Sequence, residues 1–307
     1  MNHILTLICN PCTADLCDEA LALAAACLNE LGAETADANW LARGIACEIP
    51  FSGVGLDAVE ATVQHNLQRF PIDIIVQKNI NRRKKLLIAD MDATMVMGET
   101  LDELAKFAGC KDEVAAITRL AMNGELRFVD ALKKRIKLLE GLSLDDLKKT
   151  MATVELTPGG QTLVQTMKAN GAVTMLVSGG FTYFTDRVRD LIGFDRAKGN
   201  SFEISDAKLT GRVLEPIINK DTKLRILKTF AAEHGISEMD TMAAGDGAND
   251  LPMLMAAGIG VAYHAKPVVI KSARASISHG DLTALLYLQG YQQEEFVTMA
   301  PLPCKVE

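Results

Sequence analysis

The feature that most constrains this chain is a short apolar run followed directly by two carboxylates one residue apart. Residues 86–89 read Leu-Leu-Ile-Ala, typical of a strand buried on both faces of a parallel sheet, and Asp90 and Asp92 follow. Alternate side chains of an extended chain project to the same side, so both carboxylates should leave the strand's carboxyl end, where open α/β sheets bind ligands. Such charges repel unless a cation or a shared proton relieves them. The pattern predicts a Mg²⁺ site that also takes substrate phosphate, although a solvated surface turn would give the same pattern.

The size and charge of the chain limit the classes of protein to which it can belong. Its 307 residues suffice for two domains, each with its own core. The net charge is −7 and no Lys/Arg cluster is interleaved with aromatics, which argues against nucleic-acid binding. No apolar run approaches the ~18 residues that span a membrane, and residues 1–4 lack the basic start of a secretory signal. We therefore expect a cytoplasmic protein whose seven cysteines are mainly reduced and buried.

Residues 1–83 have the pattern of a small α+β domain. Strand and helix patterns follow one another in the order βαββαβ, at residues 4–9, 14–31, 39–41, 44–50, 56–70 and 72–76. This order is the ferredoxin-like split βαβ, and it resembles an ACT-type amino-acid-sensing domain at the level of element order alone. Such a domain would bind an effector or form a homodimer, and a purely structural appendage is the alternative. The basic residues 81–85 are expected to be a solvated connector.

Residues 84–297 have the pattern of a second, larger α/β domain. Residues 98–156 are almost wholly helical in pattern, and such an insert after the first strand would lie over the sheet edge as a cap. Helix and strand patterns then alternate along the rest of the domain. A doubly wound, Rossmann-like parallel sheet is the simplest architecture for this alternation. Residues 298–307 remain as a tail.

Further polar residues fall at the ends of the later strands. Ser178 and Gly179 follow the strand pattern at 173–177, and Gly245-Asp246-Gly247 follows the pattern at 239–244. Lys223 lies near the start of a predicted helix. A hydroxyl, backbone N–H groups, an amine and a third carboxylate are the groups that a phosphoryl-transfer site needs.

These residues carry a resemblance to a known family. Four motifs match in order those of the haloacid dehalogenase-like hydrolases: Asp90-x-Asp92-x-Thr94, Ser178-Gly179, Lys223 and Gly245-Asp246-Gly247-x-Asn249-Asp250. The insert resembles the family's helical C1 cap. Within the family, the stretches 98–105, 121–128 and 177–181 are most similar to those of phosphoserine phosphatases.

The resemblance implies a mechanism. Asp90 would be the nucleophile that accepts the phosphoryl group as an aspartyl phosphate, and Asp92 would act as general acid and then general base. The Asp90 carboxylate, the backbone carbonyl of Asp92 and Asp246 would bind Mg²⁺, with Asp250 orienting them.

The same resemblance assigns the groups around the phosphate. Ser178, the N–H of Gly179 and Lys223 would bind the phosphoryl oxygens. Thr94 would support the first loop, and Asn249 would help to position the substrate.

Substrate selectivity requires one acid and one base in the cap, since phosphoserine carries an ammonium and a carboxylate. The resemblance places Glu99 at the ammonium and Arg135 at the carboxylate, with Met122 and Phe128 as apolar lining. Without it, Glu99 would be an ordinary acid at a helix start, Arg135 a solvated base, and the apolar pair core residues.

The expected function is Mg²⁺-dependent hydrolysis of O-phospho-L-serine to L-serine and phosphate, the last step of serine biosynthesis. One departure is Ala93, where the family usually has Ser in the first motif. Another small phosphomonoester, such as phosphothreonine or phosphohomoserine, or transfer to another alcohol, is the enzymatic alternative. A non-catalytic amino-acid sensor is disfavoured because the catalytic motif residues are all present.

Overall fold

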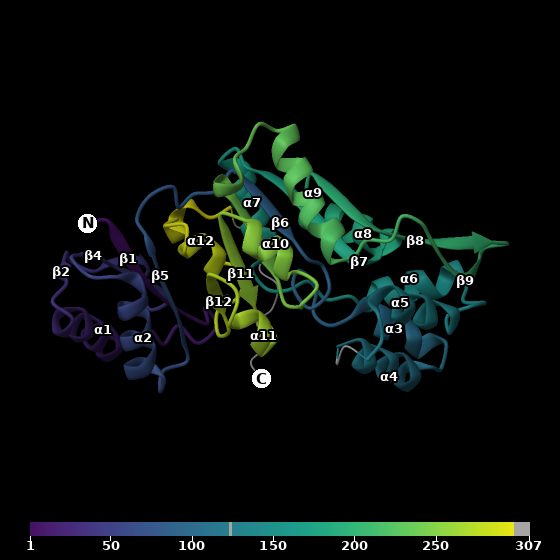
Figure 1. Cartoon of the computed structure of the whole chain (residues 1–307), viewed down its shortest axis with the longest axis horizontal. Coiled ribbons are helices and arrows are strands. Elements are labelled where there is room, and N and C mark those ends of the chain that lie inside the picture. The colour runs from purple at the N-terminus through teal and green to yellow at the C-terminus, as the bar shows by residue number, and fades with distance from the viewer. Residues whose placement is uncertain (123–124, 298–307) are drawn as a thin grey trace.

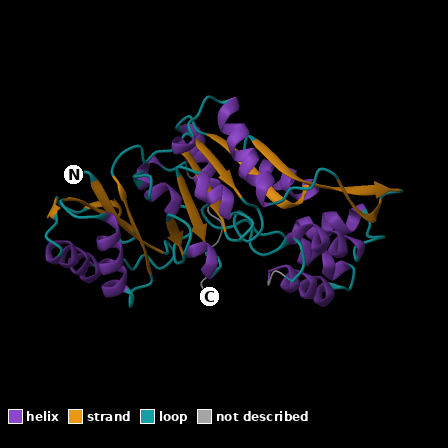
Figure 2. Cartoon of the chain, in the orientation of Figure 1, coloured by secondary structure: helices purple, strands orange, loops and turns teal. Residues whose placement is uncertain are grey.

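The computed structural model describes residues 1–122 and 125–297, without the side chain of Met122. A five-stranded sheet and a seven-stranded sheet lie side by side along the long axis of the molecule (Figure 1). A group of helices projects from the far end of the larger sheet (Figure 2). Every helix in the described part of the chain is too short or too polar to cross a bilayer.

The N-terminal unit consists of an antiparallel sheet with two helices on one face. Its elements are β1 (His3–Cys9), α1 (Asp18–Glu30), β2 (Glu34–Thr35), β3 (Asn39–Ala42), β4 (Ala46–Ser52), α2 (Leu56–Leu67) and β5 (Ile72–Lys78). The strand order is β2-β4-β1-β5, with β3 also paired to β4. The six elements predicted from the sequence are present, and β2 is an additional short strand.

Both faces of this small sheet are buried. Leu5 and Leu7 of β1 pack under α1 and α2, whereas Ile8 and Ile75 share a core with the larger unit. An antiparallel sheet commonly leaves one face in water. The second face is covered because the N-terminal unit packs against its neighbour.

The larger unit is a mainly parallel sheet with helices on both faces, as the sequence predicts. Its elements outside the helical insert are β6 (Leu86–Ala89), α7 (Gly160–Ala169), β7 (Val173–Phe181), α8 (Thr182–Ile192), β8 (Arg196–Ser205), β9 (Lys208–Leu214), α9 (Lys220–Glu233), β10 (Thr241–Gly245), α10 (Leu251–Ala256), β11 (Ile259–Tyr263), α11 (Pro267–Ile270), β12 (Ala275–Ile277) and α12 (Ala284–Tyr287), with short 3₁₀ turns at Glu238–Asp240 and Gln293–Glu295. The order is β12-β11-β10-β6-β7-β8-β9, and only β8 and β9 pair antiparallel.

The burial of β6 on both of its faces explains its apolar sequence. Leu86 and Ile88 pack against α9 and α10, while Leu87 and Ala89 face the core that includes α7, α8 and α12. Every side chain of β6 is therefore buried, and Asp90 is the first polar residue to leave the sheet.

The helical insert lies between β6 and β7, as expected. It contains α3 (Thr100–Phe107), α4 (Lys111–Met122), α5 (Phe128–Lys137) and α6 (Leu144–Thr153). The chain segments that enter and leave it run side by side, since the N–H of Met97 donates to the carbonyl of Glu155. The β8–β9 hairpin also contacts the insert, because the N–H of Gly141 donates to the carbonyl of Leu209.

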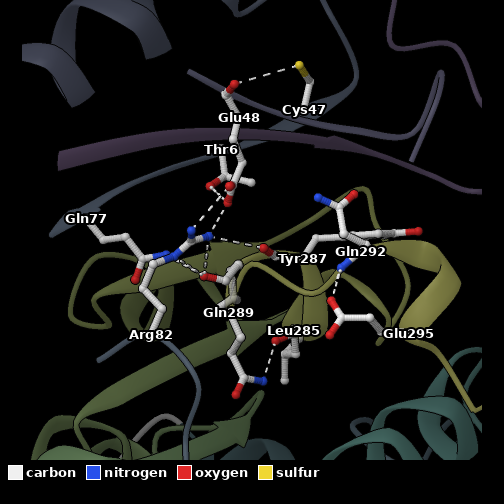
Figure 3. A network of polar contacts seen from close by, with 11 residues as sticks. Thr6, Cys47, Glu48, Gln77, Arg82, Leu285, Tyr287, Gln289, Gln292 and Glu295 are labelled. Carbon is white, nitrogen blue, oxygen red and sulfur yellow. Dashed lines mark hydrogen bonds and ion pairs between the residues drawn. The ribbon is translucent and has the colours of Figure 1, made fainter. Parts of the chain in front are cut away.

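The prediction of a solvated connector is wrong at Arg82. Its guanidinium forms an ion pair with Glu48 and donates to the carbonyls of Tyr287 and Leu288 (Figure 3). Both charged side chains are nearly buried, with 11% and 7% of their areas exposed. Nearby, the carboxylate of Asp73 accepts hydrogen bonds from the backbone N–H groups of residues 278–280. The connector thus helps to fix the two units together.

Four cysteines follow the prediction: Cys9, Cys27, Cys47 and Cys110 are buried free thiols. Cys17 is also a free thiol but is exposed. Cys12 is disulfide-bonded, contrary to the expectation of reduced thiols.

Candidate active site

The predicted polar residues meet at the carboxyl edge of the larger sheet. Since β10, β6 and β7 are neighbours, Asp246 and Asp90, which follow β10 and β6, come together with Ser178 in the last part of β7. Lys223 reaches the same place from the first turn of α9, where Asn219 caps the helix through its side chain. The strand ends named from the sequence therefore do bring these side chains together in the structure.

Lys223 lies at the centre of this group and is 1% exposed. Its Nζ is 2.7 Å from Oδ1 of Asp90 and 2.5 Å from Oδ1 of Asp250. Burial alone would lower the pKa of Lys223, but the two carboxylates raise it above its ordinary value. The amine therefore remains charged and holds Asp90 and Asp250 in place.

Three carboxylates form a cluster that suits a divalent cation. Asp90, Asp246 and Asp250 each present an oxygen, and these atoms lie within 4.8 Å of one another. Burial, followed by repulsion from Asp90, raises the pKa of Asp246 to about 6. One buried amine does not compensate three carboxylates, and oxygen ligands with surplus negative charge are what Mg²⁺ binds. The residues present thus fit the expected ion.

Asp92 is oriented by hydrogen bonds to both of its oxygens. Thr100 donates its N–H and its hydroxyl to Oδ1, at 2.8 and 2.7 Å, and Ser178 donates to Oδ2 at 3.1 Å. Burial raises the pKa of Asp92, Asp90 raises it further, and the hydrogen bonds oppose the rise. A carboxyl that favours its protonated form can serve as a proton donor.

The turn after the apolar part of β7 requires its second glycine. A Cβ at Gly180 would lie 2.9 Å from Oγ of Ser178 and 3.0 Å from Oδ2 of Asp92. The N–H of Gly180 donates to Oγ of Ser178 at 2.7 Å. The Ser178 hydroxyl is therefore fixed between the backbone and Asp92.

The supporting residues of the motifs differ in what they contact. Asn249 donates to Oδ1 of Asp250 at 3.3 Å, and so lies beside the cluster. Thr94 is fully buried, and its hydroxyl has no hydrogen-bond partner within the described residues. Ala93 has a φ of +52°, a left-handed conformation that Ala adopts at some cost.

The helical insert contributes Glu99 and Arg135, which lie close enough to interact electrostatically with Asp92. Glu99 precedes α3, and burial and then Asp92 raise its pKa to about 8. Burial lowers the pKa of Arg135, whereas Glu99 and Asp102 raise it. The side chain of Arg135 donates to Thr118 at 3.3 Å, and its Nε is buried without a partner among the described residues. Arg135 is thus not solvated as its neighbours Lys133 and Lys134 are.

The two apolar cap residues give different outcomes. Phe128, at the start of α5, lies against residues 178–180, which the resemblance expects to bind phosphate and which are called the phosphate turn from here on: a Cβ at Gly179 would be 3.3 Å from Cζ of Phe128. The prediction for Met122 concerns a side chain outside the described residues.

Sequence reasoning missed Thr100. Thr100 holds Asp92 only because the helical insert folds back over the sheet edge, a tertiary contact without a local signal. Gly180 was indicated by the sequence, because two glycines without a Cβ after Ser178 let the backbone approach closely, although sequence alone did not show which neighbours exclude a side chain.

Comparisons with known proteins show the family to which the chain belongs. The sequence profile of the haloacid dehalogenase-like hydrolases matches residues 87–255. A phosphoserine phosphatase from Streptomyces coelicolor is 40% identical over 296 residues, which cover 95% of this chain and 71% of that protein.

Solved structures give the same result. A probable phosphoserine phosphatase from Vibrio cholerae, in an unliganded form, has a TM-score of 0.77 and 30% identity, over 96% of this chain and 88% of that one. A substrate-bound phosphoserine phosphatase complex has a TM-score of 0.64 and 37% identity, over 67% of this chain and 98% of that one. The chain therefore belongs to the haloacid dehalogenase-like hydrolases.

Proposed function

We propose that this hydrolase releases L-serine and phosphate from O-phospho-L-serine. The observation that carries the proposal is that Asp90, Ser178 and Lys223 are buried together at the sheet edge, and that Glu99 and Arg135 of the helical insert interact electrostatically with the carboxylates there. The phosphate and the two charged groups of the amino acid would each have a partner of opposite charge or a donor. The similarity to named phosphoserine phosphatases supports the same substrate.

In the first step, the free oxygen of Asp90 attacks phosphorus and an O–P bond forms as the ester O–P bond breaks. Asp92 gives its proton to the leaving serine oxygen. Lys223 and Ser178, with the N–H of Gly179, bind the phosphoryl oxygens as their charge increases. The product of this step is serine and an aspartyl phosphate at Asp90.

In the second step, Asp92 takes a proton from a water molecule whose oxygen attacks the phosphorus. The bond between phosphorus and Asp90 breaks, and inorganic phosphate leaves. Thr100 keeps Asp92 in one orientation during both proton transfers, through its two hydrogen bonds to Oδ1.

Mg²⁺ would be held by the Asp90 and Asp246 carboxylates with the backbone carbonyl of Asp92, and Asp250 would orient this set while paired with Lys223. The ion would neutralise phosphate charge and so reduce the repulsion between Asp90 and its anionic substrate.

The division into units follows from the same proposal. Residues 98–156 would act as a cap that closes over the amino acid, on a phosphatase domain of residues 84–297. Residues 1–83 would be an ACT-like, ferredoxin-type domain that binds an effector or forms a homodimer. The chain would work in the cytoplasm with small-molecule substrates.

The test is phosphate release from a panel of phosphomonoesters, with Mg²⁺ and with EDTA. Phosphoserine should be preferred over phosphothreonine, phosphohomoserine and p-nitrophenyl phosphate, and EDTA should abolish release. Preference for another monoester would reject the substrate, and full activity in EDTA would reject the metal.

A further inference from the structure

The sheet loses its regular backbone pairing at the phosphate turn. Strand β8 pairs with β7 from Met175 to Val177, and pairing resumes only between Phe181 and Asn200. Residues 178–180 fall in this interruption. The backbone that would contact phosphate is therefore not held by the ladder that fixes the rest of β7.

The side chain of Asn200 replaces the missing ladder contact. It is 1% exposed, and its Nδ2 donates to the carbonyl of Gly179 at 2.6 Å. Its Oδ1 accepts from the N–H of Ile218 at 2.7 Å. A carbonyl can only accept and an N–H can only donate, so these two partners fix the orientation of the amide.

The first of these bonds completes the support of one peptide group. The peptide that joins Gly179 to Gly180 has its carbonyl held by Asn200 and its N–H held by the Ser178 hydroxyl. Glycine at both positions would otherwise allow this peptide many orientations. Because the plane of the Gly179–Gly180 peptide is fixed, the direction of the N–H of Gly179, which belongs to the preceding peptide, is restricted as well.

The second bond reaches the helix that carries the buried amine. Ile218 directly precedes Asn219, the N-cap of α9, and Lys223 lies in the first turn of that helix. One buried amide thus connects the turn after β7 to the start of α9.

We propose that Asn200 is a positioning residue for phosphoryl transfer, which sets the phosphate turn and the Lys223 helix at a fixed separation. This inference rests on the proposed phosphatase function. Asn200 does not touch the reacting atoms itself, and it acts through Gly179 and Lys223.

The test compares Asn200→Asp with Thr182→Val in the full chain. Asp keeps the size and the acceptor for Ile218 but cannot donate to Gly179 when ionised. Thr182→Val is the matched control, because its hydroxyl donates to the carbonyl of Asn200 at 2.8 Å and does not contact Gly179. The measurements are kcat and KM, the orthovanadate inhibition constant with Mg²⁺ present, and the melting temperature.

Asn200→Asp should lower kcat and weaken orthovanadate binding, each by ~10-fold or more, as expected when an oriented donor to a phosphoryl group is displaced. The ratio of kcat/KM for phosphoserine to that for p-nitrophenyl phosphate should stay unchanged, because the amino-acid end contacts other residues. Thr182→Val should keep orthovanadate affinity within about twofold even if it melts earlier. Asn200→Ala, which removes both bonds, should behave as Asn200→Asp does and replaces it if that variant does not fold.

Unchanged orthovanadate affinity in a folded Asn200 variant would overturn the inference. An equal loss in the Thr182→Val control would also overturn it, since general destabilisation would then explain the effect. Failure of the proposed substrate is distinguishable, because the wild-type chain would then hydrolyse p-nitrophenyl phosphate and bind orthovanadate but leave phosphoserine intact.

Discussion

Replacing Asp246 by Asn should stabilise the metal-free protein while it abolishes activity. Asp246 lies beside Asp90 in a partly buried cluster that has one buried amine for three carboxylates. Without a divalent ion, the charged form of Asp246 is unfavourable in the folded chain, as its pKa of about 6 indicates. Asn has the same shape without the charge, so the substitution removes this repulsion.

The size of the effect follows from the pKa. At about 1.4 kcal/mol per pKa unit, the rise from 3.8 to about 6 corresponds to at most about 3 kcal/mol of unfolding free energy. The carboxyl is protonated below about pH 6 in the folded chain and below 3.8 in the unfolded chain. The stabilisation by Asn should therefore be complete above pH 6 and shrink as the pH falls, to about one third at pH 4.5.

The assay is urea unfolding in EDTA at pH 8 and pH 4.5, repeated at pH 8 with Mg²⁺. Mg²⁺ should stabilise the wild-type chain and have little effect on Asp246→Asn. Asp145→Asn is the control. A hydrogen bond from Lys148 lowers the pKa of this exposed carboxyl, so removing the negative charge of Asp145 should not stabilise the chain. A less stable Asp246→Asn in EDTA at pH 8 would refute the reasoning.

Three further predictions concern other parts of the molecule. Glu48→Ala should lower the free energy of unfolding in urea by about 3–5 kcal/mol, because it leaves Arg82 buried without its ion-pair partner. The double variant Glu48→Leu/Arg82→Met should recover most of this loss. Equal losses in the single and the double variant would show that the ion pair does not stabilise the interface. Arg135→Ala should raise KM for phosphoserine by about 10-fold or more and leave KM for p-nitrophenyl phosphate little changed. An equal rise in KM for both substrates would exclude recognition of the serine carboxylate by Arg135. Asp90→Asn should reduce phosphate release at least about a thousandfold, so appreciable turnover would reject it as nucleophile.

Local patterns were sufficient to predict the parallel sheet of the larger unit and the edge at which its polar residues meet. The run at residues 86–89 coincides with β6, because a strand buried on both faces needs apolar residues at every position. The carboxyl ends of parallel strands meet at one edge, so the positions of Asp90, Ser178 and Asp246 followed from the strand assignments alone. The order of elements in the N-terminal unit was also predictable, because each element has its own hydrophobic period.

Contacts between elements distant in the sequence were not predictable in the same way. Arg82 lies in a basic run that is typical of a solvated connector, and its burial depends on where Glu48 and the carbonyls of Tyr287 and Leu288 lie after folding (Figure 3). Asn200 has no special sequence context, and its importance arises only where the ladder of β7 is interrupted.

The ion pair of Glu48 with Arg82 and the carboxylates around Lys223 differ in how far their charges are compensated within the chain. At the interface of the two units, Glu48 has a guanidinium partner and a hydrogen bond from Thr6, so its charge is compensated within the chain (Figure 3). At the sheet edge, Lys223 contacts two of three clustered carboxylates and leaves Asp246 with a raised pKa. A fold that compensates one buried charge fully and another only in part retains the second at a cost in stability. That cost is expected where an ion and an anionic substrate supply the missing compensation, and therefore the destabilised edge rather than the stable interface is where chemistry should occur.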